Sequence, residues 1–290
     1  MAEGDCDAWD GPEGWFGPAW QGWESYSQFA RSVRSELRYV RSPATNAFLE
    51  EVLGSCASRK VTIPNQRLFW RARLGCEWED VETTDGEITA VVEEPRPYPA
   101  EGMKPIANWL SEGRANPRGI PRLYLATTRD TALAEIRPWI GATISAAQLR
   151  VNRELNVIDC SKNHAKGSFL KVIGKSGLTR VDGIWVAIDQ AFATPVDRDI
   201  ESRDYVATQI LADLFKAAGF DGIVYKSLLT DDGFNIVLFN LDDADVVYCG
   251  LFSAESIRFH FKESGNPYFV RPKATNEAAE ADITSPPKLP

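Results

Sequence analysis

The sequence has few of the residues that the commonest catalytic and metal sites require. Only two histidines occur among 290 residues, His164 and His260, so chemistry built on histidine is a weak first hypothesis. The five cysteines are far apart and include no CxxC pair, which is atypical of a disulfide framework or a structural zinc site. Neither a GxxxxGKS/T loop nor a GxGxxG fingerprint is present. We therefore expect reduced thiols, a cytoplasmic location and no bound metal.

The chain also lacks a net positive charge and long apolar runs. Lys and Arg number 32 against 41 Asp and Glu, a formal net charge of −9, which argues against general nucleic-acid binding or binding to anionic membranes. No apolar run approaches the roughly 18–20 residues of a membrane span. Residues 1–14 lack the basic and apolar stretches of a secretory signal, so we expect none. What remains is an ordinary globular composition, 44% hydrophobic, in a chain long enough to bury a full core.

The first 60 residues form a distinct region of the sequence. Residues 8–23 contain four of the nine tryptophans, Trp9, Trp15, Trp20 and Trp23, which we interpret as a lid packed on the domain or as a partner-binding surface. Helical spacing of apolar residues predicts helices over residues 26–41 and 44–56. A row of arginines on the first helix is interpreted as a solvated face rather than a nucleic-acid contact, because the chain is acidic. The row comprises Arg31, Arg34, Arg38 and Arg41.

The rest of the chain alternates between short strand and helix patterns. An acidic, turn-rich segment is predicted after the strand at 68–74. Thr128 or Asp130 is expected to cap the helix at 128–137, which ends before Pro138. The predicted strands are 68–74, 122–126, 148–151, 155–159, 183–188, 222–226, 234–239 and 245–249, and the predicted helices are 128–137 and 204–218. Without a regular strand–helix–strand period, this order indicates an α+β fold. We expect three regions: an extension over 1–60, a catalytic domain over 61–272 and a disordered tail over 273–290.

Three islands of sequence combine Arg, Glu, Asn and Ser with glycine turns. They are FWRAR at 69–73; GRANPRG, LYLA and ALAE within 113–135; and GFDGIVYKS and GFNIVLF within 219–239, with Tyr205 and Gln209 in a Y-x-x-x-Q spacing between them. In this order the motifs resemble the RES domain, the toxin of RES–Xre toxin–antitoxin modules, over about residues 67–240. Ala115 stands where the family pattern has tryptophan.

The resemblance implies an α+β fold with a mixed sheet similar to that of ADP-ribosyltransferases, preceded here by a small helical extension. It also implies an active site that consumes NAD⁺, by hydrolysis or phosphorolysis in some members and by ADP-ribose transfer to a protein in others. An Xre-type antitoxin is the implied partner. The sequence leaves open the acceptor and the oligomeric state, including a homo-oligomer.

The same resemblance supplies candidate site residues. Glu135, Arg71 and Ser227 are the candidate catalytic residues, and Arg71, Arg114, Tyr124, Ser227 and Asn235 are the candidate NAD⁺-binding residues. Cleavage of the nicotinamide–ribose bond develops positive charge on the ribose, which a carboxylate such as Glu135 can stabilise. Arginine forks suit the pyrophosphate. A tyrosine can stack on a ring or hydrogen-bond the ribose, and a serine after a strand can reach a phosphate or the nicotinamide amide.

Each candidate also has a purely structural interpretation. Arg71 can pair with a surface glutamate, Glu135 can be a solvated helix residue, Tyr124 can belong to the core, and Ser227 can be a turn residue. Arg114, in a loop of Gly, Asn and Pro, is harder to explain by packing.

The sequence leaves three functions open. An NAD⁺-cleaving RES enzyme is the first hypothesis, and it has two alternatives. These are a protein ADP-ribosyltransferase and a catalytically silent RES-like module whose tryptophan-rich N-terminus binds a partner.

Overall fold

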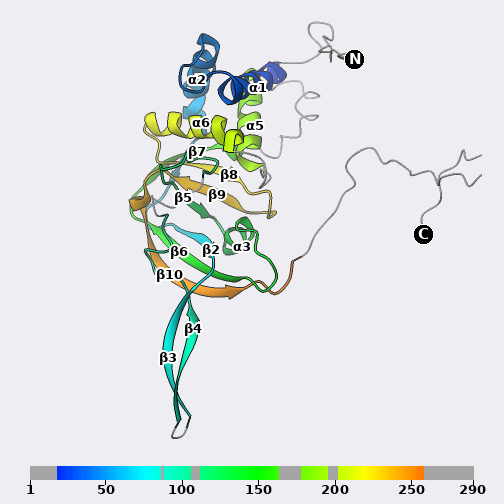
Figure 1. The fold of residues 1–290 in the computed structure, drawn as a ribbon. Helices are drawn as coiled ribbons and strands as arrows, with labels where there is room; N and C mark the ends of the chain where they lie inside the picture. Colours follow the sequence, from blue (N-terminus) through cyan, green and yellow to red (C-terminus); the bar gives the residue numbers. More distant parts are fainter. Residues whose placement is uncertain (1–17, 86–87, 106–111, 163–177, 195–201, 258–290) are drawn as a thin grey trace, which may run out of the picture. The chain divides into compact units, whose positions relative to one another are not determined.

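The computed structural model describes residues 18–85, 88–105, 112–162, 178–194 and 202–257 (Figure 1). Its helices are α1 (Pro18–Ser35), α2 (Pro43–Ser55), α3 (Arg129–Glu135), α5 (Arg180–Ala193) and α6 (Val206–Ala217), with short 3₁₀ turns η1 (Cys56–Arg59), η4 (Ser202–Tyr205) and η5 (Leu241–Asp243). Its strands are β1 (Lys60–Ile63), β2 (Leu68–Leu74), β3 (Glu77–Asp85), β4 (Ile88–Arg96), β5 (Leu123–Ala126), β6 (Thr143–Val151), β7 (Leu155–Asp159), β8 (Gly222–Lys226), β9 (Phe234–Leu238) and β10 (Ala244–Ser253). The predicted α+β class and the N-terminal helices are confirmed. Trp9, Trp15 and the tail expected over 273–290 lie outside the described residues.

Eight strands form one mixed sheet in the order β1-β7-β8-β9-β5-β2-β6-β10. Within the described residues, β7 and β8 pair in parallel and the other neighbours pair antiparallel. A parallel pair needs a long crossover connection, and here that connection contains α5 and α6. The sheet order also matters for the site, because it places β5 beside β9 of the β8–β9 pair, although β5 is far from both in the sequence.

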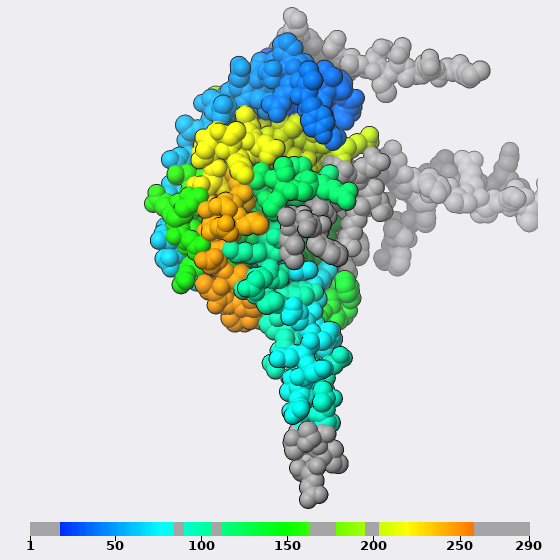
Figure 2. Space-filling model, turned by 60° about the vertical axis from the view of Figure 1, so that its left-hand side comes forward, coloured from blue at the N-terminus to red at the C-terminus, as the bar shows by residue number. Residues whose placement is uncertain are grey.

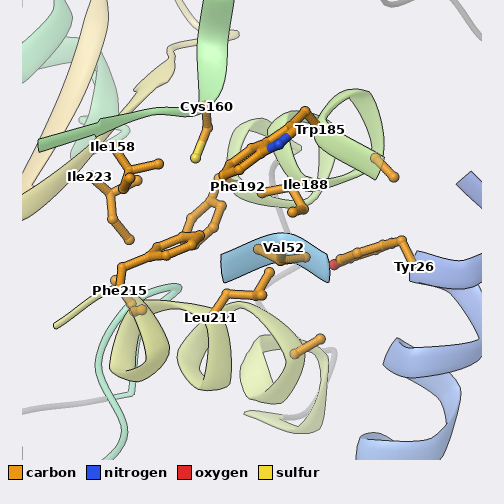
Figure 3. Packing of buried hydrophobic residues seen from close by; sticks show 14 of the residues in the cluster. Tyr26, Val52, Ile158, Cys160, Trp185, Ile188, Phe192, Leu211, Phe215 and Ile223 are labelled. Atoms are coloured by element: carbon orange, nitrogen blue, oxygen red, sulfur yellow. The ribbon is translucent and has the colours of Figure 1, made fainter. Parts of the chain in front are cut away.

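The helices cover one face of the sheet and share a hydrophobic core with it. Figure 3 shows Trp185 and Phe192 of α5 meeting Phe215 of α6, with Ile158 and Ile223 of the sheet beside them. Residues of α1 and α2 belong to the same cluster, among them Tyr26, Phe29, Phe48 and Val52. Fully burying one such large side chain contributes roughly 1.5–3 kcal/mol. A second cluster includes Phe69, Leu125, Leu149, Ile236 and Leu238.

The first two helices are joined closely to the rest of the fold. A Cβ built on Gly22 of α1 would lie 1.9 Å from the carbonyl oxygen of Arg180, and one built on Gly183 of α5 would lie 1.8 Å from that of Ala19. These glycines therefore allow the two helix backbones to touch. Arg180 also forms an ion pair with Glu51 of α2, at 3.0 Å. Trp20 and Trp23 stack at 5.1 Å between ring centroids and are half-buried, not fully buried.

Several predicted boundaries are confirmed. The strand predicted at 68–74 is β2, and Thr128 caps α3 by accepting a hydrogen bond from the backbone N–H of Thr131. Gly219 has a φ of 87° just after α6, the left-handed conformation that glycine adopts at a helix end.

Within the described residues, no helix is both long and apolar enough to cross a bilayer.

The strand predicted over 183–188 is wrong, because these residues lie inside α5. The helix starts at a capping box in which Thr179 and Asp182 each bond the backbone of the other. Gly183, Ile184, Trp185, Val186, Ala187 and Ile188 are all buried. A helix buried on every side gives the same unbroken apolar run as a buried strand, so the run itself did not distinguish the two.

Two further predictions are corrected. The segment predicted to be turn-rich after β2 forms the hairpin β3–β4, a separate two-stranded sheet. The helix predicted over 26–41 is shifted toward the N-terminus, because α1 starts at Pro18 and ends at Ser35. Leu37 and Val40, two apolar residues of the predicted helix, therefore lie beyond α1 and are 49% and 74% exposed.

Candidate active site

The candidate site centres on the carboxylate of Glu135, the last residue of α3. Ser227 Oγ donates a hydrogen bond of 2.7 Å to Glu135 Oε1, and Asn235 Nδ2 donates one of 2.6 Å to the same oxygen. Ser227 follows β8 and Asn235 is in β9, paired with Tyr225. Three of the predicted residues are thus brought together across more than 90 positions of sequence. Two donors on one oxygen fix the orientation of the carboxylate and leave Oε2 for another group.

The loop that carries Ser227 is tied to α3. Thr131 Oγ1 lies 2.7 Å from Thr128 Oγ1 and 2.9 Å from Thr230 Oγ1, so a row of hydroxyls links the start of the helix to the loop. A Cβ built on Gly233 would lie 1.9 Å from Thr131 Oγ1, so this close approach requires glycine. Both partners of the Ser227–Glu135 bond are therefore held by one local network.

Lys226 closes the same loop from within. Its ammonium donates to the carbonyl oxygens of Thr230 at 3.4 Å and Gly233 at 3.0 Å, and also to that of Asp231. The backbone N–H of Ser227 bonds the carbonyl oxygen of Gly233 at 3.1 Å. The Ser227 hydroxyl in turn accepts from the backbone N–H of Leu229 at 3.2 Å. With an acceptor role and a donor role both in use, this hydroxyl is oriented toward the carboxylate.

Tyr124 of β5 organises the loop that contains Arg114. Its hydroxyl donates to Asn116 Oδ1 at 2.8 Å and accepts from the backbone N–H of Ala115 at 2.9 Å. Gln209 donates to the carbonyl oxygens of Gly113 and Asn116, at 3.0 and 3.2 Å. Burial raises the pKa of Tyr124 to about 12, so the phenol stays neutral. The predicted ribose contact is untested, and in this structure the hydroxyl is engaged with the loop.

Arg114 extends from that loop toward the end of α5. Its guanidinium donates to the carbonyl oxygen of Phe192 and lies 5.8 Å from the centroid of the Tyr225 ring. Burial raises the pKa of Tyr225, Arg114 opposes that shift, and Glu135 and Tyr124 add to it. Tyr225 therefore lies beside Arg114 and is the strand partner of Asn235. The sequence analysis quoted Tyr225 within a motif without assigning it a role.

Arg71 of β2 is the candidate with unused hydrogen-bonding capacity. Its Nη1 donates to the carbonyl oxygen of Tyr124 at 3.0 Å, while its buried Nε has no hydrogen-bond partner among the described residues. Burial, with a smaller contribution from Arg73, lowers its pKa to about 10. Arg73 differs, since it donates to the carbonyl oxygen of Gly102 at 2.6 Å and lies over the Tyr98 ring. A buried cation with an unpaired donor is costly unless an anion joins it.

The arrangement divides the predicted residues into two groups. Glu135, Ser227 and Asn235 bond one another directly, whereas Arg71, Arg114 and Tyr124 meet through the β5 strand and its preceding loop. A cavity of about 330 Å³, lined by Phe69, Val224, Phe234, Ile236 and others, contains none of these six residues. Phe234 and Ile236 flank Asn235 in β9, so the cavity lies on the other face of the sheet. Within the described part of the chain, no His, Cys, Asp and Glu side chains group as metal ligands.

Comparison with known proteins places the chain in a family. Residues 69–262 match the RES domain, and the chain belongs to the RES domain family. Among solved structures, a chain of the M. tuberculosis MbcT–MbcA toxin–antitoxin complex aligns with 15% sequence identity and a TM-score of 0.37, over 71% of this chain and 93% of that chain. Among curated proteins, no sequence matches the chain.

Proposed function

We propose that the chain cleaves the nicotinamide–ribose bond of NAD⁺ and acts as a growth-inhibiting toxin with a cognate Xre-type antitoxin. The observation that carries the proposal is the convergence of Ser227 and Asn235 on Glu135 Oε1 in a chain of the RES family. A carboxylate oriented by two donors is what stabilisation of a developing positive charge requires. A module that only binds a partner has no need of this arrangement.

The reaction assigns a role to each part of the site. The bond between ribose C1′ and the nicotinamide nitrogen breaks, and neutral nicotinamide leaves with the electron pair. The positive charge that remains on the ribosyl group is stabilised by Glu135, as in glycoside cleavage. The acceptor forms the new bond at C1′ and releases its proton to solvent. Ser227 and Asn235 act by holding the carboxylate in place.

The two arginines are proposed to bind the pyrophosphate. Arg71 is half-buried and its buried Nε has no hydrogen-bond partner among the described residues, so an anion would supply the missing acceptor. Arg114 already donates to the carbonyl oxygen of Phe192, so we assign it the smaller share of phosphate binding. Tyr124 supports both residues through its backbone oxygen and its hydroxyl. NAD⁺ is thus the substrate, and the proposal needs no metal.

A direct assay tests this function and its alternatives. Purified protein is incubated with NAD⁺ in phosphate buffer, and released nicotinamide is measured with its co-products. ADP-ribose indicates hydrolysis, its phosphorylated form indicates phosphorolysis, and label retained on protein indicates ADP-ribosyl transfer. If folded wild-type protein releases no nicotinamide from NAD⁺, the result would support the catalytically silent interaction module instead.

We further propose that residues 61–272 form the catalytic domain and that residues 1–60 stabilise it. The described part of the extension supports this, because Tyr26, Phe29, Phe48 and Val52 are buried in one cluster with α5 and α6. The proposed location is the cytoplasm, where NAD⁺ is available. The four described cysteines are all free thiols, which fits a reducing compartment.

A further inference from the structure

The hairpin β3–β4 is an exposed arm with no role in the site. It is a separate two-stranded sheet whose strands pair from Glu77↔Arg96 to Asp85↔Ile88. Figures 1 and 2 show it projecting away from the eight-stranded sheet. An isolated two-stranded hairpin is marginally stable in water, so an arm of this length gains stability when something packs on it. We call β3–β4 the acidic arm.

One face of the acidic arm combines unneutralised carboxylates with exposed apolar side chains. Residues paired across the strands share a face, and on this face Trp78 pairs with Pro95, Asp80 with Glu93, and Glu82 with Val91. Trp78 and Val91 are each 64% exposed. Asp80 opposite Glu93 is a destabilising like-charge pair. No ion pair between described residues involves Asp80, Glu82 or Glu93.

The opposite face of the arm differs, because there carboxylates are paired with a cation of the chain itself. There Arg96 forms ion pairs with Glu79 at 3.1 Å and Glu94 at 3.4 Å. The chain therefore supplies its own cation on one face and leaves the other face without one. The unneutralised face has the chemistry to bind arginines beside apolar side chains.

A surface with the complementary chemistry lies between α1 and α2. Within residues 37–41, which we call the basic loop, Leu37, Tyr39 and Val40 are 49%, 90% and 74% exposed. Arg38 and Arg41 are also exposed and take part in no ion pair between described residues. The basic loop thus presents two guanidinium groups around a tyrosine and a valine. Guanidinium groups bind carboxylates in a bidentate manner and also stack over tryptophan.

The acidic arm and the basic loop of one copy lie in different parts of the fold. The arm leaves the sheet after β2, next to β6 and β10. The basic loop precedes α2, which continues through η1 into β1 at the other edge of the sheet. Figure 2 shows the acidic arm, in cyan, and the N-terminal helices, in blue, at opposite ends of the described residues in this view. One copy therefore cannot bring the two surfaces together.

We propose that the chain self-associates by docking the acidic arm of one copy on the basic loop of a second copy. Arg38 and Arg41 offset two of the three negative charges of Asp80, Glu82 and Glu93, while Tyr39 and Val40 cover Trp78 and Val91. The occupant is a second copy because one chain carries both incomplete surfaces and a single contact completes both. The net charge of −9 does not prevent this, since repulsion beyond about 8 Å is screened at physiological salt. A reciprocal exchange of arms closes as a two-fold dimer, in which the contact is made twice.

Sedimentation velocity of the full chain over roughly 1–100 µM tests the contact, because the dissociation constants of weak specific interfaces are about micromolar. We expect concentration-dependent association of the wild type. The arm variant Asp80→Lys/Glu93→Lys and the loop variant Arg38→Glu/Arg41→Glu should each be monomeric. The control variant Glu154→Lys/Glu255→Lys makes the same charge change as the arm variant at exposed sites elsewhere, and it should associate like the wild type. Circular dichroism checks that every variant is folded.

Mixing the two variants distinguishes this contact from any other cause of dissociation. The wild-type loop of the arm variant faces the wild-type arm of the loop variant, and the reversed arm faces the reversed loop. Association should therefore return in the mixture, although each variant alone is monomeric. A wild type that stays monomeric over the whole range, association that survives both reversals, or a mixture that stays monomeric would each overturn the proposal.

Discussion

The hydroxyl of Ser227 donates a 2.7 Å hydrogen bond to Oε1 of Glu135, across 92 positions of sequence. Because Asn235 donates to the same oxygen, the carboxylate is held both from β9 and from the loop that follows β8. The rows of threonine hydroxyls and the Lys226 ammonium fix the loop that carries the serine. Preorganisation of this kind is the main way in which proteins stabilise charge that develops during a reaction.

Glu135→Gln should abolish most NAD⁺ cleavage. The amide keeps the size of the side chain and removes its charge, and loss of one electrostatic contact of this kind typically slows a reaction by about 10²–10³-fold. Nicotinamide release is the measurement. Glu50→Gln, at an exposed position of α2, is the matched control and should leave the rate unchanged. A rate for Glu135→Gln close to that of wild type would remove Glu135 from the proposed mechanism.

Arg71→Lys should weaken NAD⁺ binding more than Arg73→Lys. Lysine keeps the charge but not the fork, so we expect a dissociation constant about tenfold higher, or about 1.4 kcal/mol, for Arg71→Lys. Arg73 is engaged with Gly102 and Tyr98, so its replacement should affect stability and leave affinity near the wild-type value. Titration calorimetry measures both. Equal affinities for the two variants would contradict the phosphate role of Arg71.

Thr131→Val should lower kcat through the position of the Ser227 loop. Valine has nearly the shape of threonine but cannot bond Thr128 and Thr230, so the loop loses its link to α3. Small displacements of reacting groups can cost up to about 10²-fold in rate, and we expect a fall in kcat with little change in KM. Thr131→Ser retains the hydroxyl and should restore the rate. A purely structural role would change the melting temperature of Thr131→Val and leave kcat intact.

Gly22→Ala should destabilise the whole domain, because the new methyl would meet the Arg180 carbonyl oxygen at 1.9 Å. Forcing α1 away from α5 should cost roughly 1–3 kcal/mol of the free energy of unfolding and lower Tm by several degrees. Gly54→Ala in α2 is the control, since nothing lies within 4 Å of its Cβ position. It should raise stability by roughly 0.5–1 kcal/mol through helix propensity. Thermal melts of both variants test whether the N-terminal helices are part of the domain core. If Gly22→Ala melts like wild type, the N-terminal helices do not stabilise the catalytic domain.

Local patterns in the sequence determined many of the elements and the family. Strands β2, β8 and β9, the cap at Thr128 and the glycine after α6 follow from alternation, capping and turn chemistry over a few residues. The RES motifs pointed to Glu135, Ser227 and Asn235 one by one. Each of these signals lies within a short stretch of chain, which is why they could be recognised without a structure.

Only the tertiary structure decided which of these residues meet, and in which role. The sheet order places β5, β9 and β8 side by side, so that Ser227 and Asn235 reach Glu135, and Tyr225 lies between its strand partner Asn235 and Arg114. Burial on all sides made α5 resemble a strand in the sequence, and its packing against α1 and α6 accounts for that burial. Strand pairing across the acidic arm set carboxylate against carboxylate, which no single strand reveals. Contacts between distant segments depend on the free energy of the whole fold, so they cannot be read from a pattern within a short stretch of sequence.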